Sequence, residues 1–169
     1  MSKQELETTA QALVAAGKGI LAADESTGTI KKRFDTISLE STETTRRDYR
    51  EMLFRAEGAE QHISGVILYD ETLRQTAADG TRLAELLSSK GVIPGIKVDT
   101  GAKDLAGFPG EKVTEGLDGL RARLSEYREL GARFAKWRGV ITIGAGMPTR
   151  FCLEANAHGL ARYAALCQE

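Results

Sequence analysis

The chain has 169 residues, which is the length of one ordinary domain and enough to bury a hydrophobic core. Hydrophobic residues make up 41% of it and charged residues 28%, a balance typical of folded proteins. The net charge of −1 argues against a general binder of nucleic acid or anionic membranes. No apolar run approaches the roughly 20 residues that cross a bilayer, and the polar N-terminus is unlike a secretion signal or transit peptide. We therefore expect a cytoplasmic protein without a membrane or nucleic-acid partner.

Helical and strand patterns alternate from the N-terminus onward. Apolar residues at helical spacing predict a leading helix over residues 4–16. The short apolar run 19–23 then predicts a strand buried on both faces, followed by a polar loop over residues 25–41. Residues 42–59 predict a helix with one apolar stripe, formed by Tyr49, Met52, Leu53 and Ala56.

The same alternation continues to the last residues. Apolar runs predict strands over 63–69, 92–98 and 134–143. Between and after them, helical spacing predicts helices over 81–90, 117–130 and 149–168. The apolar stripe of the last helix consists of Leu153, Ala157, Leu160, Ala164 and Cys167. Strand–helix alternation indicates an α/β fold with a parallel sheet and right-handed crossovers, and we expect residues 1–169 to form one domain.

Neither a metal nor a nucleotide cofactor is expected. Cys152 and Cys167 lie 15 residues apart on one predicted helix, roughly 22 Å, which is too far for a disulfide. They also form no CxxC pair of the kind that zinc sites use. The glycines at 144–146 follow a predicted strand, but Thr149 stands where a dinucleotide-binding turn needs its third glycine.

Charged residues lie at the ends of three predicted strands, where parallel α/β folds place their reactive groups. Asp24 ends the first strand, Lys97 lies in the third with Asp99 two residues on, and Lys136 and Arg138 share one face of the fourth. Each alone also fits an edge strand or an ion-pair network. Together they favour a site for a phosphorylated or carboxylated substrate, in which a lysine among cations acts on a carbonyl and a neighbouring aspartate acts as a base.

The loop after the first strand adds candidate phosphate ligands. Ser26 and Thr29 offer hydroxyl groups, and Lys32 and Arg33 follow at once. An ordinary solvated turn with a basic patch explains this segment equally well. Arg46 opens the next helix and either reaches the rim of the site or lies on the surface.

Several segments resemble the class I, Schiff-base-forming fructose-bisphosphate aldolases. They are LAADESTGTIKKR (21–33), GVILYDETL (65–73), GIKVDTG (95–101), LAGFPGEKVTEGLDGL (105–120) and FAKWRGV (134–140). Residues 154–168 also resemble a helical motif of that family. The resemblance covers nearly the whole chain, and it implies a (β/α)₈ TIM barrel, a phosphorylated sugar substrate and no metal.

The resemblance also implies roles for single residues. Asp24 matches the acidic residue that handles the C4 hydroxyl, and Lys136 the fourth-strand lysine that assists proton transfer and stabilises charge. Lys97 and Arg138 match cations near the phosphate remote from the keto end. The matches to the phosphate-facing loop and to the substrate mouth are Ser26, Thr29, Lys32, Arg33 and Arg46. Thr29 replaces the serine that is commoner in the family.

One departure from the family pattern is large. A barrel of this kind has eight strand–helix units and usually about 250 residues, whereas this sequence supplies the first four units. The fifth-strand glutamates and the sixth-strand Schiff-base lysine have no counterpart, so we expect the chain alone to be inactive. A half-barrel has unpaired edges at its first and fourth strands, so we also expect it to be a homo-oligomer or to associate through these edges.

Three hypotheses follow from the sequence. The first is the N-terminal half of a class I aldolase of glycolysis, with Asp24 and Lys136 in the chemistry. In the second, the chain is an enzyme by itself, with Lys136 as nucleophile and Asp24 as base. The third is a non-catalytic half-barrel that binds sugar phosphates or assembles with a partner half.

Overall fold

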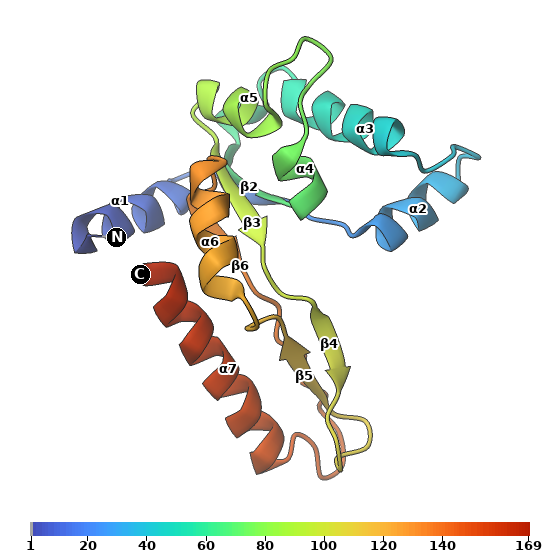
Figure 1. Ribbon diagram of the computed structural model, residues 1–169, viewed down its shortest axis with the longest axis vertical. Helices are drawn as coiled ribbons and strands as arrows, with labels where there is room; N and C mark the ends of the chain where they lie inside the picture. The colour runs from blue at the N-terminus through green and yellow to red at the C-terminus, as the bar shows by residue number, and fades with distance from the viewer. Residues whose placement is uncertain (1) are drawn as a thin grey trace. The chain divides into compact units, whose positions relative to one another are not determined.

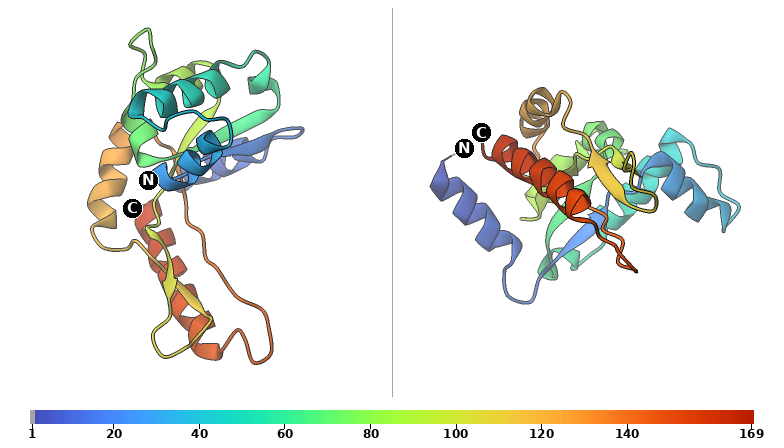
Figure 2. Two further views of the ribbon diagram at one scale, coloured as in Figure 1. Left: turned by 90° about the vertical axis from the view of Figure 1, so that its right-hand side faces the viewer. Right: turned by 90° about the horizontal axis from the view of Figure 1, so that it is seen from below.

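The computed structural model describes residues 2–169, which form two compact units. The sheet unit comprises residues 2–97 and 127–135. The hairpin unit comprises residues 98–126 and 136–169. Figures 1 and 2 show the course of the chain and its helices and strands.

The sheet unit contains most of the strand–helix alternation that the sequence predicts. Its elements in chain order are α1 (Lys3–Leu13), β1 (Gly19–Ala23), α2 (Thr27–Asp35), α3 (Glu43–Arg55), a 3₁₀ turn (Ala59–Gln61), β2 (Ile63–Leu68), α4 (Asp70–Arg74), α5 (Leu83–Ser89) and β3 (Ile93–Lys97). The short strand β6 (Phe134–Lys136) begins in this unit.

The strands form one sheet in the order β1-β2-β3-β6. β1 and β2 are parallel, with Ala23 opposite Leu68, and β2 and β3 are parallel, with Leu68 opposite Ile96. The predicted α/β fold with a parallel sheet is therefore confirmed. Gly95 allows β6 to pack closely, because a Cβ at this position would lie 2.3 Å from the ring of Phe134.

Apolar side chains from strands and helices form the core of the sheet unit. β2 and β3 contribute Val66, Leu68 and Ile96, each 1% exposed or less. The helices cover them with residues that are at most 4% exposed: Ile30, Phe34, Phe54, Leu73, Leu83, Ala84 and Leu87. Burial of these side chains supplies the main favourable free energy of this unit.

Four details of the sheet unit differ from the sequence prediction. β1 is not buried on both faces, because it is the edge strand of the sheet, and Ile20 is 44% exposed. The expected loop over residues 25–41 contains helix α2, which Ser26 caps. α3 ends at Arg55 and buries Arg50 and Phe54, whereas Met52 of the predicted stripe is 60% exposed. A short helix, α4, was not predicted.

The hairpin unit contains a β-hairpin that the sequence analysis missed. β4 (Gly101–Asp104) and β5 (Lys112–Glu115) pair antiparallel, and α7 (Arg150–Gln168) packs against β5 (Figures 1 and 2). The first part of α6 (Leu120–Glu129) also belongs to this unit. Gly116 ends the hairpin with φ +130°, and a Cβ there would lie 2.9 Å from the backbone nitrogen of Thr100, so only glycine fits.

Two predictions in the hairpin unit are wrong. The expected strand 134–143 ends at Lys136, and the following apolar residues are outside any strand, with Ile143 87% exposed. α7 buries Cys152 and Asn156, whereas the predicted stripe is largely exposed, including Leu153 and Leu160. The reason is that Cys152 and Asn156 both contact the carbonyl oxygen of Lys112 on β5, which fixes the face that α7 turns inward.

Residues 2–169 show neither a candidate membrane helix nor a candidate metal cluster. Within residues 2–169, no helix is both long enough and apolar enough to cross a membrane. The same residues contain no group of three or more His, Cys, Asp or Glu side chains that could hold a metal ion.

Candidate functional site

In the sheet unit, two of the predicted site residues lie at the carboxyl edge of the sheet. Asp24 directly follows β1, and Lys97 is the last residue of β3. β2 separates the two strands, and both side chains are half-buried. This edge is where parallel sheets bind their ligands.

The backbone around Asp24 is held by a buried arginine. Arg50 of α3 is 1% exposed, and its Nε donates to the carbonyl oxygen of Ala23 at 2.9 Å. Its Nη2 donates to the carbonyl oxygen of Glu25 at 3.1 Å and to the Glu25 carboxylate at 3.0 Å. Burial lowers the pKa of Arg50 from its ordinary value, while Glu25 opposes that shift. Arg50 was not predicted from the sequence, since an arginine on a polar helix gives no signal of burial.

The predicted phosphate loop is the beginning of α2. The Ser26 hydroxyl accepts from the Thr29 amide at 3.4 Å and lies 3.1 Å from the Thr29 hydroxyl. Thr29, Lys32 and Arg33 are exposed. The structure therefore places these four residues on one short segment, and Arg33 forms an ion pair with Glu25.

Arg46 lies in the first turn and a half of α3 and is held in a two-point ion pair. Its Nε donates to Glu71 Oε1 at 2.8 Å and its Nη2 to Oε2 at 2.5 Å, and Nη1 donates to the carbonyl oxygen of Ser41. The bonds to Glu71 raise the pKa of Arg46. The Arg46 side chain is 11% exposed, so it would have to break its ion pair with Glu71 in order to bind a ligand.

In the hairpin unit, Lys136 and Arg138 do not share a strand. Lys136 closes β6, and its carbonyl oxygen accepts from the Val98 amide at 3.1 Å. Arg138 lies beyond the strand and is exposed. Its backbone amide donates to Asp99 Oδ2 at 3.3 Å, and Asp99 Oδ1 accepts from the Gly101 amide. Asp99 is 8% exposed and thus connects the start of the hairpin to the segment after β6.

A second buried carboxylate stabilises the start of α7. Glu111 is 1% exposed, and its two oxygens accept from the Thr149 amide at 2.7 Å and the Thr149 hydroxyl at 2.6 Å. These bonds hold the pKa of Glu111 below its ordinary value. The arrangement joins the hairpin to the N-cap residue of α7 and satisfies its polar groups, so it is structural.

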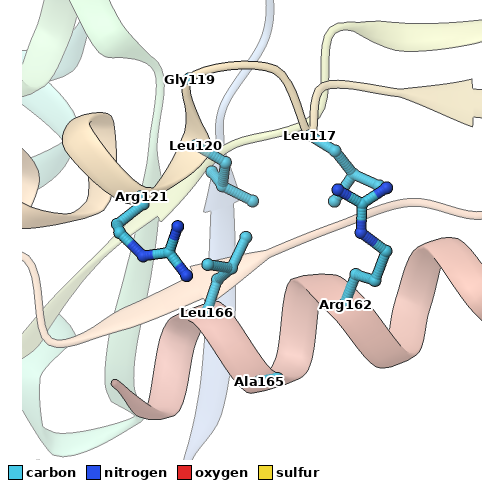
Figure 3. A pocket seen from close by; sticks show the side chains of 7 residues that line it. All are labelled: Leu117, Gly119, Leu120, Arg121, Arg162, Ala165 and Leu166. Atoms are coloured by element: carbon cyan, nitrogen blue, oxygen red, sulfur yellow. The ribbon is translucent and has the colours of Figure 1, made fainter.

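A pocket of about 350 Å³ lies between α6 and α7 of the hairpin unit (Figure 3). Leu117, Leu120 and Leu166 form its apolar surface, and Arg121 and Arg162 lie at its rim. Arg121 Nε donates to both carboxylate oxygens of Glu169, at 2.9 and 3.1 Å. None of the predicted site residues lines this pocket.

Comparison with known proteins agrees with the motifs. The model of the family "Glycolytic: Fructose-bisphosphate aldolase class-I" matches residues 5–169. A probable fructose-bisphosphate aldolase class 1 from Xanthomonas campestris is 62% identical over all 169 residues, which cover 51% of that protein. A cytosolic fructose-bisphosphate aldolase 5 from Arabidopsis thaliana is 56% identical over 98% of this chain and 46% of its own length.

The fold comparison is equally close. The structure of fructose-bisphosphate aldolase from Plasmodium falciparum, solved with TRAP and a small-molecule inhibitor, superimposes with a TM-score of 0.95 at 54% identity. The match covers 98% of this chain and 48% of the Plasmodium chain. The chain thus spans about half the length of the curated relatives it matches.

Proposed function

We infer that this chain, which belongs to the class I fructose-bisphosphate aldolase family, takes part in the reversible cleavage of fructose 1,6-bisphosphate to dihydroxyacetone phosphate and glyceraldehyde 3-phosphate. The observation that carries this proposal is the family match over residues 5–169, which includes every candidate site residue. The reaction belongs to glycolysis and gluconeogenesis.

The architecture we propose is the first half of a (β/α)₈ barrel. Residues 1–169 would form its N-terminal half, with a leading helix and four strand–helix units. The strand order β1-β2-β3-β6 and the coverage of about half of each relative support this proposal. In this arrangement the carboxyl ends of the strands carry the catalytic groups.

The proposed chemistry divides between this half and the other. The covalent intermediate forms on a Schiff-base lysine outside these residues, and its iminium accepts the electron pair of the breaking C3–C4 bond. Asp24 handles the proton of the C4 hydroxyl as the new aldehyde forms. Lys136 assists proton transfer and stabilises developing negative charge. The reaction needs no metal or cofactor.

The remaining candidates bind the substrate's phosphates and hydroxyls, because guanidinium and ammonium groups complement phosphate oxygens. Arg33 and Arg46 each have a carboxylate partner, Glu25 and Glu71, so a phosphate would compete with that partner. The full proposed set is Lys97, Arg138, Ser26, Thr29, Lys32, Arg33 and Arg46.

The exposed edge strand β1 favours a second candidate function. Such an edge pairs readily with another strand, and Ile20 on it is 44% exposed. The chain would then be a non-catalytic half-barrel that binds sugar phosphates or assembles with a partner half or a second copy. For either function we propose a cytoplasmic location, as the name of the Arabidopsis relative states for that protein.

The test joins residues 1–169 to the second half of the Xanthomonas campestris relative and measures cleavage of fructose 1,6-bisphosphate. We expect an active chimera whose kcat falls by about 10²–10⁴-fold in Asp24→Asn and in Lys136→Met, the range for loss of an acid–base group. Lys103→Met, at an exposed lysine of the hairpin, is the matched control and should keep full activity. A folded but inactive chimera, or full activity in both variants, would contradict the proposal.

A further inference from the structure

The buried guanidinium of Arg50 has no role in the function proposed so far. Its residue is 1% exposed, and removing a charged group from water costs several kcal/mol unless bonds replace the lost hydration. Arg50 belongs to α3 and reaches across to the end of β1. Three hydrogen bonds, to the carbonyl oxygens of Ala23 and Glu25 and to the Glu25 carboxylate, replace the lost hydration of Arg50.

The bonds of Arg50 fix the two residues on either side of Asp24. Nε donates to the carbonyl oxygen of Ala23 at 2.9 Å, and Nη2 donates to the carbonyl oxygen of Glu25 at 3.1 Å. One rigid planar group therefore holds the peptide unit that joins Ala23 to Asp24 and the peptide unit that follows Glu25, so the short segment that carries Asp24 is fixed at both ends. The Ala23 contact is wholly buried, so water does not compete for it.

We propose that Arg50 is a positioning residue for Asp24, setting the direction in which the Asp24 carboxylate points toward the substrate. This inference rests on the proposed function, in which Asp24 handles the proton of the C4 hydroxyl. A proton-transfer group must lie within hydrogen-bond distance of its target, and a displacement of about 1 Å costs about 10²-fold in rate. Arg50 acts through Asp24 and does not touch the substrate.

Glu25 is the counterion of this arrangement. Its carboxylate accepts from Arg50 Nη2 at 3.0 Å and also pairs with Arg33 of α2. Glu25→Gln removes the carboxylate charge but neither of the two carbonyl oxygens to which Arg50 donates. Glu25→Gln should therefore lower kcat much less than Arg50→Gln, which removes the bond to Ala23.

The activity test uses the chimera described above. Arg50→Gln should lower kcat about 10²-fold with little change in KM, and Arg50→Lys should recover part of the loss. In an Asp24→Asn background, Arg50→Gln should cost nothing more, because two residues that act as a unit are not additive. Arg55→Gln, at an exposed arginine of the same helix, is the matched control and should leave kcat unchanged.

A second measurement does not depend on activity. In the 169-residue chain, the backbone order parameters of residues 23–25 should fall in Arg50→Gln from about 0.85 toward 0.6, and stay high in Glu25→Gln. Unchanged order parameters in a folded Arg50→Gln chain, or an equal loss of kcat with and without Asp24, would overturn the proposal. If Arg50→Gln does not fold, the same two criteria apply to Arg50→Lys. An inactive parent chimera together with loosened residues 23–25 would contradict the proposed function and support the role of Arg50.

Discussion

The sheet unit and the hairpin unit are each stabilised internally by a different kind of interaction. The sheet unit has a core of leucine, isoleucine, valine and phenylalanine side chains with almost no exposed area. The hairpin unit depends more on side chains that bond to backbone, such as Asn156 Nδ2 to the carbonyl oxygen of Lys112 at 2.9 Å and Thr114 Oγ1 to that of Arg138 at 2.7 Å. Its buried apolar core is smaller and consists of Val98, Leu105, Leu120 and Cys152.

This difference shows which parts of a sequence can be interpreted from periodicity. An apolar core needs apolar residues at regular spacing, so its pattern is visible in the sequence. A unit joined by hydrogen bonds between distant residues leaves no such pattern.

The two units can be followed by different spectroscopic signals. Trp137 is the single tryptophan of the chain and lies in the hairpin unit, so its fluorescence reports on that unit, while circular dichroism reports on all helices.

The largest effect is expected from a cavity in the sheet unit. Leu68 is 0% exposed on β2, so Leu68→Ala should lower the free energy of unfolding by about 2–5 kcal/mol. Urea unfolding followed by circular dichroism measures the loss. Met52→Ala is the control, since Met52 is 60% exposed. Equal losses in the two variants would contradict the assignment of the core.

A smaller loss is expected from a polar change in the hairpin unit. Asn156→Ala removes the donor to the carbonyl oxygens of Lys112 and Cys152, which should cost about 1–3 kcal/mol. The urea midpoint of Trp137 fluorescence should shift, while amide exchange in β2 and β3 should change less. An equal increase in exchange in both units would show that the comparison between them is wrong.

Acid should weaken the hairpin unit through Glu111. The Thr149 bonds lower the pKa of Glu111 in the folded state, so its contribution is fully present above the unfolded pKa of about 4.3 and is lost as the pH falls through the folded value. In urea titrations by Trp137 fluorescence, the difference between the parent and Glu111→Gln should therefore be largest near neutral pH and shrink below about pH 4. A difference that grows with acid would have the wrong sign.

The smallest effect is expected on the exposed face of α7. Leu160 is 40% exposed, so Leu160→Ser should change the free energy of unfolding by less than about 0.5 kcal/mol. Leu120→Ser, at a residue with 0% exposure in the same unit, should cost far more. If Leu160→Ser lowers the free energy of unfolding by more than about 2 kcal/mol, the face of α7 predicted from the sequence is the buried one.

Much of the fold could be predicted, and the exceptions have physical causes. Strands 63–69 and 92–98 and helix 117–130 have strong apolar patterns and appear close to the expected bounds. α2 was missed, although Ser26 as N-cap with Ile30 and Phe34 on one face was a usable signal. The hairpin of β4 and β5 has only four residues in each strand, too few for a pattern.

Only those residues of the candidate site that lie at the ends of strands could be placed from the sequence. Asp24 and Lys97 lie at the ends of strands in the structure, as expected, whereas Lys136, expected inside a longer strand, is the last residue of β6. The contacts around the site residues could not be predicted from the sequence. Arg50, for example, bonds to Ala23 and Glu25, the neighbours of Asp24, from 25 or more positions away. The catalytic and binding roles themselves remain predictions for the experiments above.

We propose that this chain supplies Asp24 and Lys136 to the cleavage reaction, whereas the Schiff-base lysine lies outside it. The most direct measurement is the intact mass after treatment with dihydroxyacetone phosphate and borohydride, for the 169-residue chain and for the chimera. We predict that the chain stays at 18.3 kDa and that the chimera gains one adduct on a lysine of its second half. An adduct on the chain alone, lost in Lys136→Ala, would contradict the claim and make Lys136 the nucleophile.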